Sequence, residues 1–303
     1  MDNLTHTLAG FALAESGLKR ATRLGTATLL LAANLPDLDG LSYLVGSSSD
    51  GLAFRRGWTH GVLAMVVLPP LLAAGLLLSA RMTSRKSEGV RWKGLLLLAA
   101  VGVWSHPLLD LLNTYGVRLL MPFSGRWFYG DALFIVDPWI WITLLLGVWW
   151  GRLRRREGPA QAAVALCAGY ALVMVFATRL GEAAVARQAS GAPARRTLAS
   201  PVFGNPLQRR VVRDLGDRYS LGDLTLGTTW RYVTRDERLV GCDTPDAALA
   251  ARTVAGRVFL RWARFPFCIT ERERDSVRVI IDDARYAGAG SSWARVIIRL
   301  PLH

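Results

Sequence analysis

Two uncharged stretches of the chain are long enough to cross a membrane. Residues 61–80 (GVLAMVVLPPLLAAGLLLSA) and 159–178 (PAQAAVALCAGYALVMVFAT) contain no Asp, Glu, Lys or Arg. A helix of about 20 apolar residues spans the roughly 30 Å of a hydrocarbon core. The whole chain agrees, because 51% of its residues are hydrophobic and its mean hydropathy is +0.26. The sequence therefore predicts a membrane protein.

Much of the positive charge is gathered in short loops. The net charge is +14, and twelve basic residues lie in three loops: Lys19, Arg20 and Arg23; Arg81, Arg85, Lys86, Arg91 and Lys93; and Arg152, Arg154, Arg155 and Arg156. Such clusters are typical of cytoplasmic loops. No nucleic-acid-binding motif accompanies them, so we expect no nucleic acid partner.

The positions of these loops predict five to six membrane segments. The segments are residues 5–18, 24–44, 61–80, 94–112, 139–150 and 159–178. Segments 5–18 and 139–150 are short for complete spans. The first residues lack the basic cluster and cleavage site of a signal peptide, so we expect the internal segments to anchor the chain. The predicted fold class is an α-helical, multi-pass membrane bundle.

The composition changes after residue 180. Residues 181–206 are rich in Ala, Arg, Ser, Gly and Pro and are predicted to form a linker after a membrane-embedded domain of residues 1–180. The runs TTWRYVT, GRVFLRWARF, SVRVIIDDARY and ARVIIRL follow, with the glycine-rich turn AGAGSS between the last two. Their alternating pattern is typical of strands. We predict a small β-rich extramembrane domain over residues 207–303, which the span count places outside.

The cysteines separate by region. Cys167 lies within a predicted span, whereas Cys242 and Cys268 lie in the β-rich domain. In an oxidising exterior, Cys242 and Cys268 could form a disulfide. Two free thiols are the alternative, which we favour.

Six potential metal ligands from four segments arrive at one predicted face of the membrane. They occur in THTLAG, NLPDLD, GWTHG and SHPLLD, and they are His6, Asp37, Asp39, His60, His106 and Asp110. The topology rests on lysine and arginine positions alone, so this convergence is an independent observation. Ionisable groups at membrane depth are costly and tend to be functional. We therefore expect a metal site.

The spacing within the motifs indicates which candidate ligands can point to the same site. His106 and Asp110 are four residues apart, which places both on one helical face. Asp37 and Asp39 would diverge on a helix, although a turn after Pro36 could aim both inward or only one. Each motif also has a structural interpretation. His6 could be an interfacial residue, the two aspartates a helix-end motif, and the His–Asp pair a buried hydrogen-bonded pair.

Imidazole and carboxylate ligands suit Zn²⁺, Mn²⁺ or Fe²⁺. The expected ligands of a divalent ion, with zinc first, are His6, Asp39, His60, His106 and Asp110, and the candidates for a catalytic base are Asp37 and Asp39. The six candidate groups are more than the four ligands of one closed tetrahedral site. They could hold one ion with a catalytic water or two neighbouring ions.

The motifs MDNLTHTLAG, NLPDLD, RGWTHG and SHPLLDLLNTYG resemble those of the YdjM-like family of bacterial inner-membrane metal-dependent hydrolases. The resemblance covers about the first 140 residues, and RFPF and IIDDARY are similar to the family's C-terminal region. It implies a membrane-embedded hydrolase, multi-pass in the cytoplasmic (inner) membrane of a bacterium, with a metal site near one surface. The order of histidines and aspartates is more distantly similar to zinc-dependent phospholipase C. Those phospholipases use further histidine and glutamate ligands, whereas the fourth histidine here is His303.

The function that we expect is hydrolysis of an ester or phosphoester of a lipid or envelope metabolite by a metal-activated water. Arg55, Arg56 and Arg126 could bind a phosphate group, or simply contact lipid headgroups. Asn113 could orient a ligand or substrate, or cap a helix end.

Two other classes of function use the same residues. A divalent-metal transporter or sensor should place its site near the bilayer midplane between related repeats. A membrane scaffold would use the cluster structurally and bind a protein through the β-rich domain. The expected partners are membrane lipids and a small-molecule or lipid substrate, and the sequence identifies no protein partner.

Overall fold

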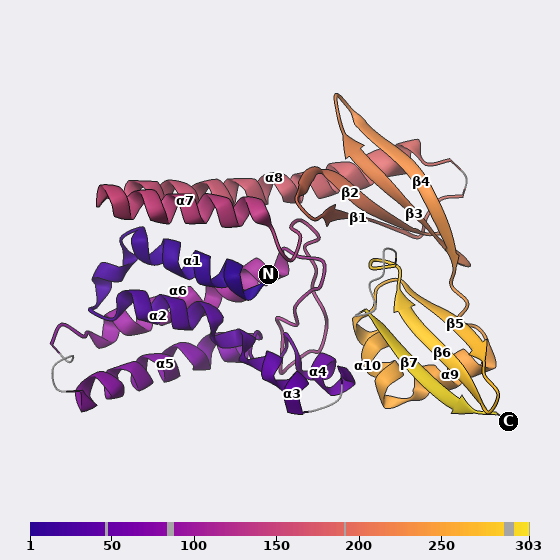
Figure 1. Ribbon diagram of the computed structural model, residues 1–303, viewed down its shortest axis with the longest axis horizontal. Coiled ribbons are helices and arrows are strands. Elements are labelled where there is room, and N and C mark those ends of the chain that lie inside the picture. Colours follow the sequence, from indigo (N-terminus) through magenta and orange to yellow (C-terminus); the bar gives the residue numbers. More distant parts are fainter. Residues whose placement is uncertain (46–47, 84–87, 191, 288–293, 303) are drawn as a thin grey trace. The chain divides into compact units, whose positions relative to one another are not determined.

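The computed structural model describes residues 1–303 apart from 46–47, 84–87, 191, 288–293 and 303 (Figure 1). Arg85, Lys86, the turn at residues 288–292 and His303 therefore lie outside the described residues. The chain forms two compact units. The helical unit comprises Met1–Leu41 and Phe54–Phe176, and the β unit comprises Ser42–Ala53 and Ala177–His303.

The helical unit is built from α-helices joined by short 3₁₀ turns. In chain order the elements of this region are α1 (Asn3–Glu15), η1 (Leu18–Ala21), α2 (Gly25–Asn34), η2 (Leu35–Leu41), α3 (Ser42–Val45), α4 (Ser48–Phe54), α5 (Val62–Met82), α6 (Trp92–Leu111), α7 (Pro138–Arg154) and α8 (Gly158–Gln188). The short α3 and most of α4 belong to the β unit, which α8 also enters.

Within the described residues, three helices are long and apolar enough to cross a membrane, namely α5, α6 and α8. The helices α1, α2 and α7 have 13, 10 and 17 residues and are shorter. The helical, membrane-type N-terminal region is confirmed. The expected five to six spans are not confirmed.

The stretch 24–44 is not the single span that we predicted. Helix α2 ends at Asn34, and the chain continues as the 3₁₀ turn η2 through Pro36, Asp37 and Asp39. Pro36 has no backbone N–H to donate to the preceding turn, so the α-helical hydrogen bonds are interrupted there. The tighter turn brings both carboxylates to the end of the helical unit.

Small residues let the helices approach closely. Helix α6 contacts α2 and α5, and α1 contacts α2 and α7 (Figure 1). A Cβ atom added to Gly10 of α1 would lie 2.9 Å from the Leu29 carbonyl oxygen of α2, and one added to Gly102 of α6 would lie 2.5 Å from Ala32 Cβ. The same holds between α7 and α8, where Gly147 faces Ala163. This close packing fixes the positions of the helix ends that carry the candidate ligands.

The β unit contains two antiparallel sheets (Figure 1). The first has the order β1 (Arg196–Val202), β2 (Asn205–Asp214), β3 (Arg218–Leu226) and β4 (Trp230–Leu239), and the second has the order β5 (Pro266–Arg272), β6 (Ser276–Asp283) and β7 (Arg295–Pro301). Leu198 and Val212 of the first sheet pack in one core with Phe267 of the second. Val185 of α8 packs with Ala199 and other residues of the first sheet.

Two sequence predictions for this unit are wrong in detail. Residues 181–206, expected to be a linker, contain the end of α8, all of β1 and the start of β2. The run GRVFLRWARF, expected to be a strand, lies mostly in helix α10 (Val254–Trp262), which follows α9 (Pro245–Arg252). Thr253 caps α10 by accepting a hydrogen bond from Gly256 N, and Phe259 and Trp262 lie one turn apart on its buried face. The same residues fit a helical period as well as alternation.

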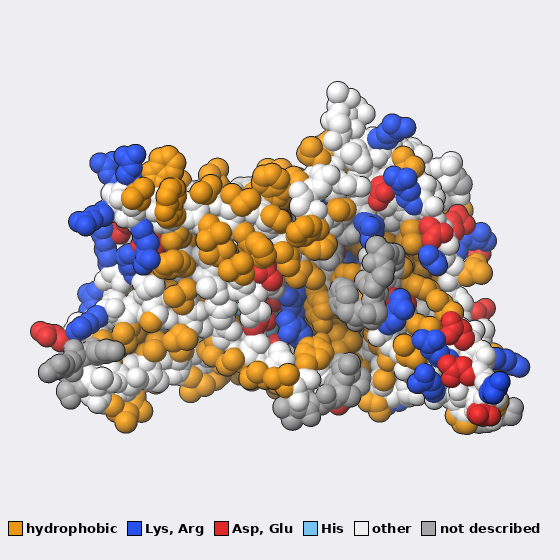
Figure 2. All heavy atoms as spheres, in the orientation of Figure 1, with side chains coloured by type: hydrophobic (Ala, Val, Ile, Leu, Met, Phe, Trp, Pro, Cys, Tyr) orange, Lys and Arg blue, Asp and Glu red, His pale blue; other side chains and the backbone are white. Residues whose placement is uncertain are grey.

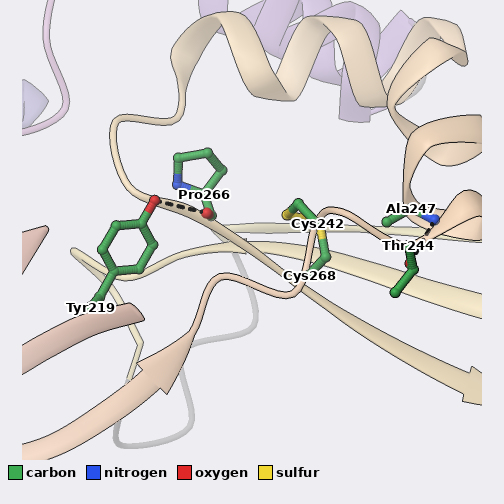
Figure 3. Close-up of a disulfide and its surroundings, with 6 residues drawn as sticks. All are labelled: Tyr219, Cys242, Thr244, Ala247, Pro266 and Cys268. Atoms are coloured by element: carbon green, nitrogen blue, oxygen red, sulfur yellow. Dashed lines mark hydrogen bonds between the residues drawn. A yellow bond between two sulfur atoms is a disulfide. The ribbon is translucent and has the colours of Figure 1, made fainter. Parts of the chain in front are cut away.

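Cys242 and Cys268 form a disulfide (Figure 3). Our preference for two free thiols is therefore wrong. The bridge joins the start of the second sheet to the segment that follows the first, and the Tyr219 hydroxyl donates to the Pro266 carbonyl beside it at 3.0 Å. Cys167 lies apart as a free cysteine.

Candidate metal centre

The predicted site segments come together at one end of the helical unit. His6 lies in the first turns of α1, and His60 lies directly before α5. Asp37 lies in η2, which follows α2, and His106 and Asp110 lie in the last turns of α6. Helices α1 and α5 start at the end of the unit where α2 and α6 finish, so the four segments that carry the candidate ligands meet there.

Local sequence fixes the placement of two histidines. Asp2 is the N-cap of α1 and accepts two backbone N–H groups of its first turn, so the helix starts just before His6. His106 and Asp110 share a face of α6 because they are four residues apart. The rings of His6 and His106 are stacked with centroids 3.6 Å apart, and both are buried.

His60 and His106 point the same ring nitrogen at each other. Their Nε2 atoms are 3.1 Å apart, and they lie 3.2 and 3.6 Å from Asp110 Oδ2. On the opposite side of each ring, Nδ1 is hydrogen-bonded. The partner is the Thr59 hydroxyl at 2.9 Å for His60 and the Ala33 carbonyl at 2.6 Å for His106. Metal-binding histidines usually have their second nitrogen held in this way.

The two oxygens of Asp110 have different partners. Oδ1 lies 3.0 Å from Arg56 Nη2 and accepts from Asn113 Nδ2 at 3.5 Å and from the Met1 amino group. Oδ2 faces the histidines and has no hydrogen-bond partner among the described residues. One oxygen therefore anchors the carboxylate and the other is available to a ligand.

Asp39 interacts with the outer side of His60. Its Oδ2 accepts from Arg56 N at 2.6 Å and from the Thr59 hydroxyl at 2.9 Å, and it lies 3.3 Å from His60 Nδ1. We expected Asp39 to be a metal ligand. This geometry instead places Oδ2 of Asp39 behind the ring, away from the nitrogen that faces His106.

Asp37 faces the inner side of the same cluster. Its Oδ1 lies 3.8 Å from His106 Nε2, 4.0 Å from His60 Nε2 and 3.6 Å from Arg55 Nη2. The 3₁₀ turn aims the two aspartates at opposite nitrogens of His60, which spacing alone could not distinguish.

Several buried polar atoms of the cluster lack a hydrogen-bond partner within the described part of the chain. They include both ring nitrogens of His6, both oxygens of Asp37 and Oδ2 of Asp110. A buried polar atom without a hydrogen bond costs about 1–3 kcal/mol. A cation bound among them would supply the missing interactions, so these residues fit a metal ion.

Two groups of donor atoms have the spacing of a metal site. One is His6, Asp37 and His106, and the other is His60, His106 and Asp110, with the donor atoms of each group within 4.8 Å of one another. His106 offers only Nε2, because its Nδ1 contacts the Ala33 carbonyl. Both groups therefore depend on one nitrogen atom and describe a single centre.

The electrostatics of His60 suit metal binding. Burial lowers the pKa of His60, because the charged ring would lose its hydration, although the hydrogen bond with Asp39 acts in the opposite direction. The neutral ring that results is the form that donates a lone pair to a metal.

The residues expected to bind substrate have different environments. Arg56 is buried at 2% exposure, and besides Asp110 it contacts Asn113, the Gly116 carbonyl and the face of Tyr115. Arg56 therefore anchors Asp110 and the turn beyond α6 from within the centre. Arg55 is half-buried beside Asp37.

Asn113 and Arg126 also differ from each other. Asn113 is buried beside Asp110. Its Oδ1 accepts from Tyr115 N at 2.9 Å just beyond α6, and its Nδ2 donates to Asp110. Arg126 is exposed, and its guanidinium lies over the Phe128 ring.

Sequence reasoning missed Thr59 and the Ala33 carbonyl. Thr59 immediately precedes His60, and a hydroxyl beside a candidate ligand is a usable signal. A backbone carbonyl carries no signal in the sequence, because any residue at position 33 would supply it.

Comparisons with known proteins place this centre in a family. Residues 1–181 match the YdjM inner membrane protein family. The chain belongs to this family. It is 30% identical to "Inner membrane protein YbcI" of Escherichia coli (strain K12) over 155 residues, covering 41% of this chain and 82% of that protein. It is 24% identical to "Uncharacterized protein YfhP" of Bacillus subtilis (strain 168) over 163 residues, covering 50% of this chain and 46% of that protein.

The YdjM match covers all the candidate ligands, which end at Asp110, and identifies an inner membrane protein family. The chain spans less than half the length of YfhP. No solved structure matches the chain. The comparisons do not show the more distant similarity to phospholipase C.

Proposed function

We propose that this YdjM family chain is a membrane-embedded, metal-dependent hydrolase of an ester or phosphoester of a lipid or envelope metabolite. One observation carries the proposal. The Nε2 atoms of His60 and His106 and the open Oδ2 of Asp110 converge, while their other polar atoms are held from behind. A structural polar network would leave no buried atom without a partner, whereas Asp110 Oδ2 has none among the described residues.

We assign His60, His106 and Asp110 as the principal ligands. Three protein ligands with an open position are typical of catalytic rather than structural sites. His6 groups with Asp37 and His106 and borders the open position. Imidazole and carboxylate favour Zn²⁺, with Mn²⁺ and Fe²⁺ as alternatives. A divalent ion bound there would polarise the scissile bond and lower the pKa of a water molecule.

Asp37 and Arg55 are the residues that we assign to the reaction itself. Hydrolysis adds the oxygen of water to the carbonyl carbon or phosphorus, breaks the bond to the ester oxygen and transfers a proton to the leaving alcohol. Asp37 has two open oxygens and accepts the proton of the water. Arg55 lies beside it and is half-buried, so it can bind the negative charge of a phosphate group.

The surroundings of the centre favour an amphipathic substrate. Leu38, Trp58 and Leu108 alternate with the candidate ligands along the chain, and their side chains are about half exposed. Polar groups thus point inward while apolar side chains face outward from the same segments. An acyl chain could lie against these side chains while its ester reaches the cluster.

The location of the cluster also bears on the transporter alternative. A transport site should lie near the middle of interrupted helices. Here the candidate ligands lie in the last turns of α6, the first turns of α1 and the segment before α5. This placement at helix ends favours catalysis over transport or scaffolding.

We propose that the β unit lies outside and the arginine-rich loops lie in the cytoplasm. The loop at Arg152–Arg156 precedes α8, a candidate span that leads to the β unit. The disulfide supports this orientation, because such bonds persist in oxidising compartments. Reporter fusions after Arg156 and after Arg187 should report opposite sides of the membrane, and two cytoplasmic readings would contradict the orientation.

Hydrolysis is tested by assaying purified protein against matched phosphoester and carboxylester lipids. Chelation should abolish turnover and added Zn²⁺, Mn²⁺ or Fe²⁺ should restore it. Asp37→Asn should retain metal and lose about 10²–10⁴-fold in rate. Loss of metal in this variant would instead make Asp37 a ligand. Metal binding without turnover of any ester would contradict the hydrolase proposal.

A further inference from the structure

A second polar site lies at the opposite end of the helical unit, among the arginine-rich loops. Figure 2 shows Lys and Arg side chains gathered at the left end of this unit, beside a broad apolar surface over its helices. A pocket of about 290 Å³ opens there between the end of α1 and the turn from α7 to α8. Five cations line it: Lys19, Arg20, Arg152, Arg155 and Arg156.

Three of these cations already have partners. Lys19 and Arg152 pair with Glu15, and Arg20 pairs with Glu157 at 2.8 Å. These pairs fix the walls of the pocket. Arg155 and Arg156 have no ion pair with any described residue, and both are exposed. The pocket therefore carries a surplus of positive charge that the protein itself does not neutralise.

The backbone supports a role for the side chain of Arg155. Arg155 is the C-cap of α7 and has a φ of 51°, in the left-handed region. Glycine is the residue that adopts this conformation without cost at a helix end. An arginine there tolerates backbone strain, and such strain is concentrated at functional sites.

The apolar surface beside the pocket identifies the kind of ligand. Trp149, Trp150 and Leu153 of α7 directly precede the arginines, and their side chains are 53–66% exposed. Tryptophans are enriched at the boundary between headgroups and acyl chains. A ligand held there would have an anionic group in the pocket and hydrocarbon against α7.

We propose that this pocket binds the headgroup of an anionic phospholipid. Basic pockets between membrane helices on the cytoplasmic side are known to suit such headgroups. The phosphate would contact Arg155 and Arg156, and the acyl chains would lie along α7. This site is distinct from the metal centre and does not depend on the hydrolase proposal.

The test is native mass spectrometry of the detergent-solubilised full chain with added phosphatidylglycerol or phosphatidylcholine of the same acyl chains. The wild type should retain phosphatidylglycerol preferentially. The double variant Arg155→Gln/Arg156→Gln should bind it about 30-fold more weakly, the effect of two interfacial cations. The matched control is Arg81→Gln/Lys93→Gln, which removes two exposed charges at the same end of the helices but outside the pocket.

The control should keep its lipid preference. An equal loss of phosphatidylglycerol binding in both double variants would mean that the lipid is attracted by the overall positive charge, and it would overturn the proposed pocket. Equal retention of both lipids by the wild type would also overturn it. Competition by millimolar inorganic phosphate as effective as that by phosphatidylglycerol would make this a free-anion site and would overturn the lipid assignment.

Discussion

The helical unit and the β unit each bury a cluster of charged residues, and they do so in different ways. In the β unit, Asp283 and Arg285 are both buried, with an Nη2–Oδ2 distance of 2.9 Å. Asp283 also accepts from the backbone N–H groups of Arg264 and Arg285. The Arg285 guanidinium lies beside the stacked rings of Trp262 and Tyr286, 4.7 and 5.0 Å from their centroids. The opposite charges in this cluster satisfy each other.

The cluster of the helical unit is satisfied only on its outer side. Arg56, Thr59 and Ala33 hold one atom of each principal ligand, as Arg285 holds Asp283. On the inner side, Asp110 Oδ2 has no hydrogen-bond partner among the described residues, and the Nε2 atoms of His60 and His106 contact each other. Burial and charge alone therefore do not distinguish a structural cluster from a functional one. The distinction lies in which atoms remain open and whether they face a common point.

The largest expected effect is loss of metal from the helical unit. His106→Ala removes the one nitrogen that both donor groups share, so bound metal and hydrolysis should both be abolished. The protein should still insert, because removing a polar group from a span makes insertion easier. Elemental analysis of the purified variant checks this, with His303→Ala as the histidine control. Full metal content in His106→Ala would mean that the cluster of the helical unit is structural, like that of the β unit.

The converse change should affect the β unit alone. Arg285→Leu leaves Asp283 buried without its cation, which typically costs about 3–5 kcal/mol. We expect the β unit to unfold at lower temperature and to be cleaved faster by a protease, with unchanged metal content. Loss of metal in this variant would show that the clusters are not independent.

A smaller effect is expected from the residue behind His60. Asp39→Asn keeps the size of the side chain but removes the charge that orients the ring, so metal affinity should fall about 10- to 100-fold. Competition with a chelator measures this change. Loss as complete as in His106→Ala would instead make Asp39 a direct ligand, as the sequence first indicated.

The sequence predicted the set of residues at the centre better than their roles. The positions of arginines and lysines predicted that His6, His60, His106 and Asp110 share one end of the bundle, because loop charge and helix direction are both local features. It did not distinguish Asp37 from Asp39, because a 3₁₀ turn and an α-helix point successive side chains in different directions. The burial of Arg56 was not predicted, because it depends on contacts with residues about 55 positions away.

The fold was predicted in the same uneven way. Apolar length indicated α5, α6 and α8, while α2 was predicted too long because the effect of Pro36 on the helix was underestimated. Strand β1 was assigned to a linker because its sequence, RTLASPV, has little alternation. Its pairing with β2 is a tertiary contact that composition does not record.

The most direct test of the account is the metal content of the wild-type chain. The protein should be purified in detergent without chelator and measured by elemental analysis beside a His60→Ala/His106→Ala double variant. We predict about one divalent ion per wild-type chain, as a single centre requires, and none above background in the double variant. Wild-type protein that holds no divalent metal, and takes none up from Zn²⁺, Mn²⁺ or Fe²⁺ after dialysis, would contradict the account.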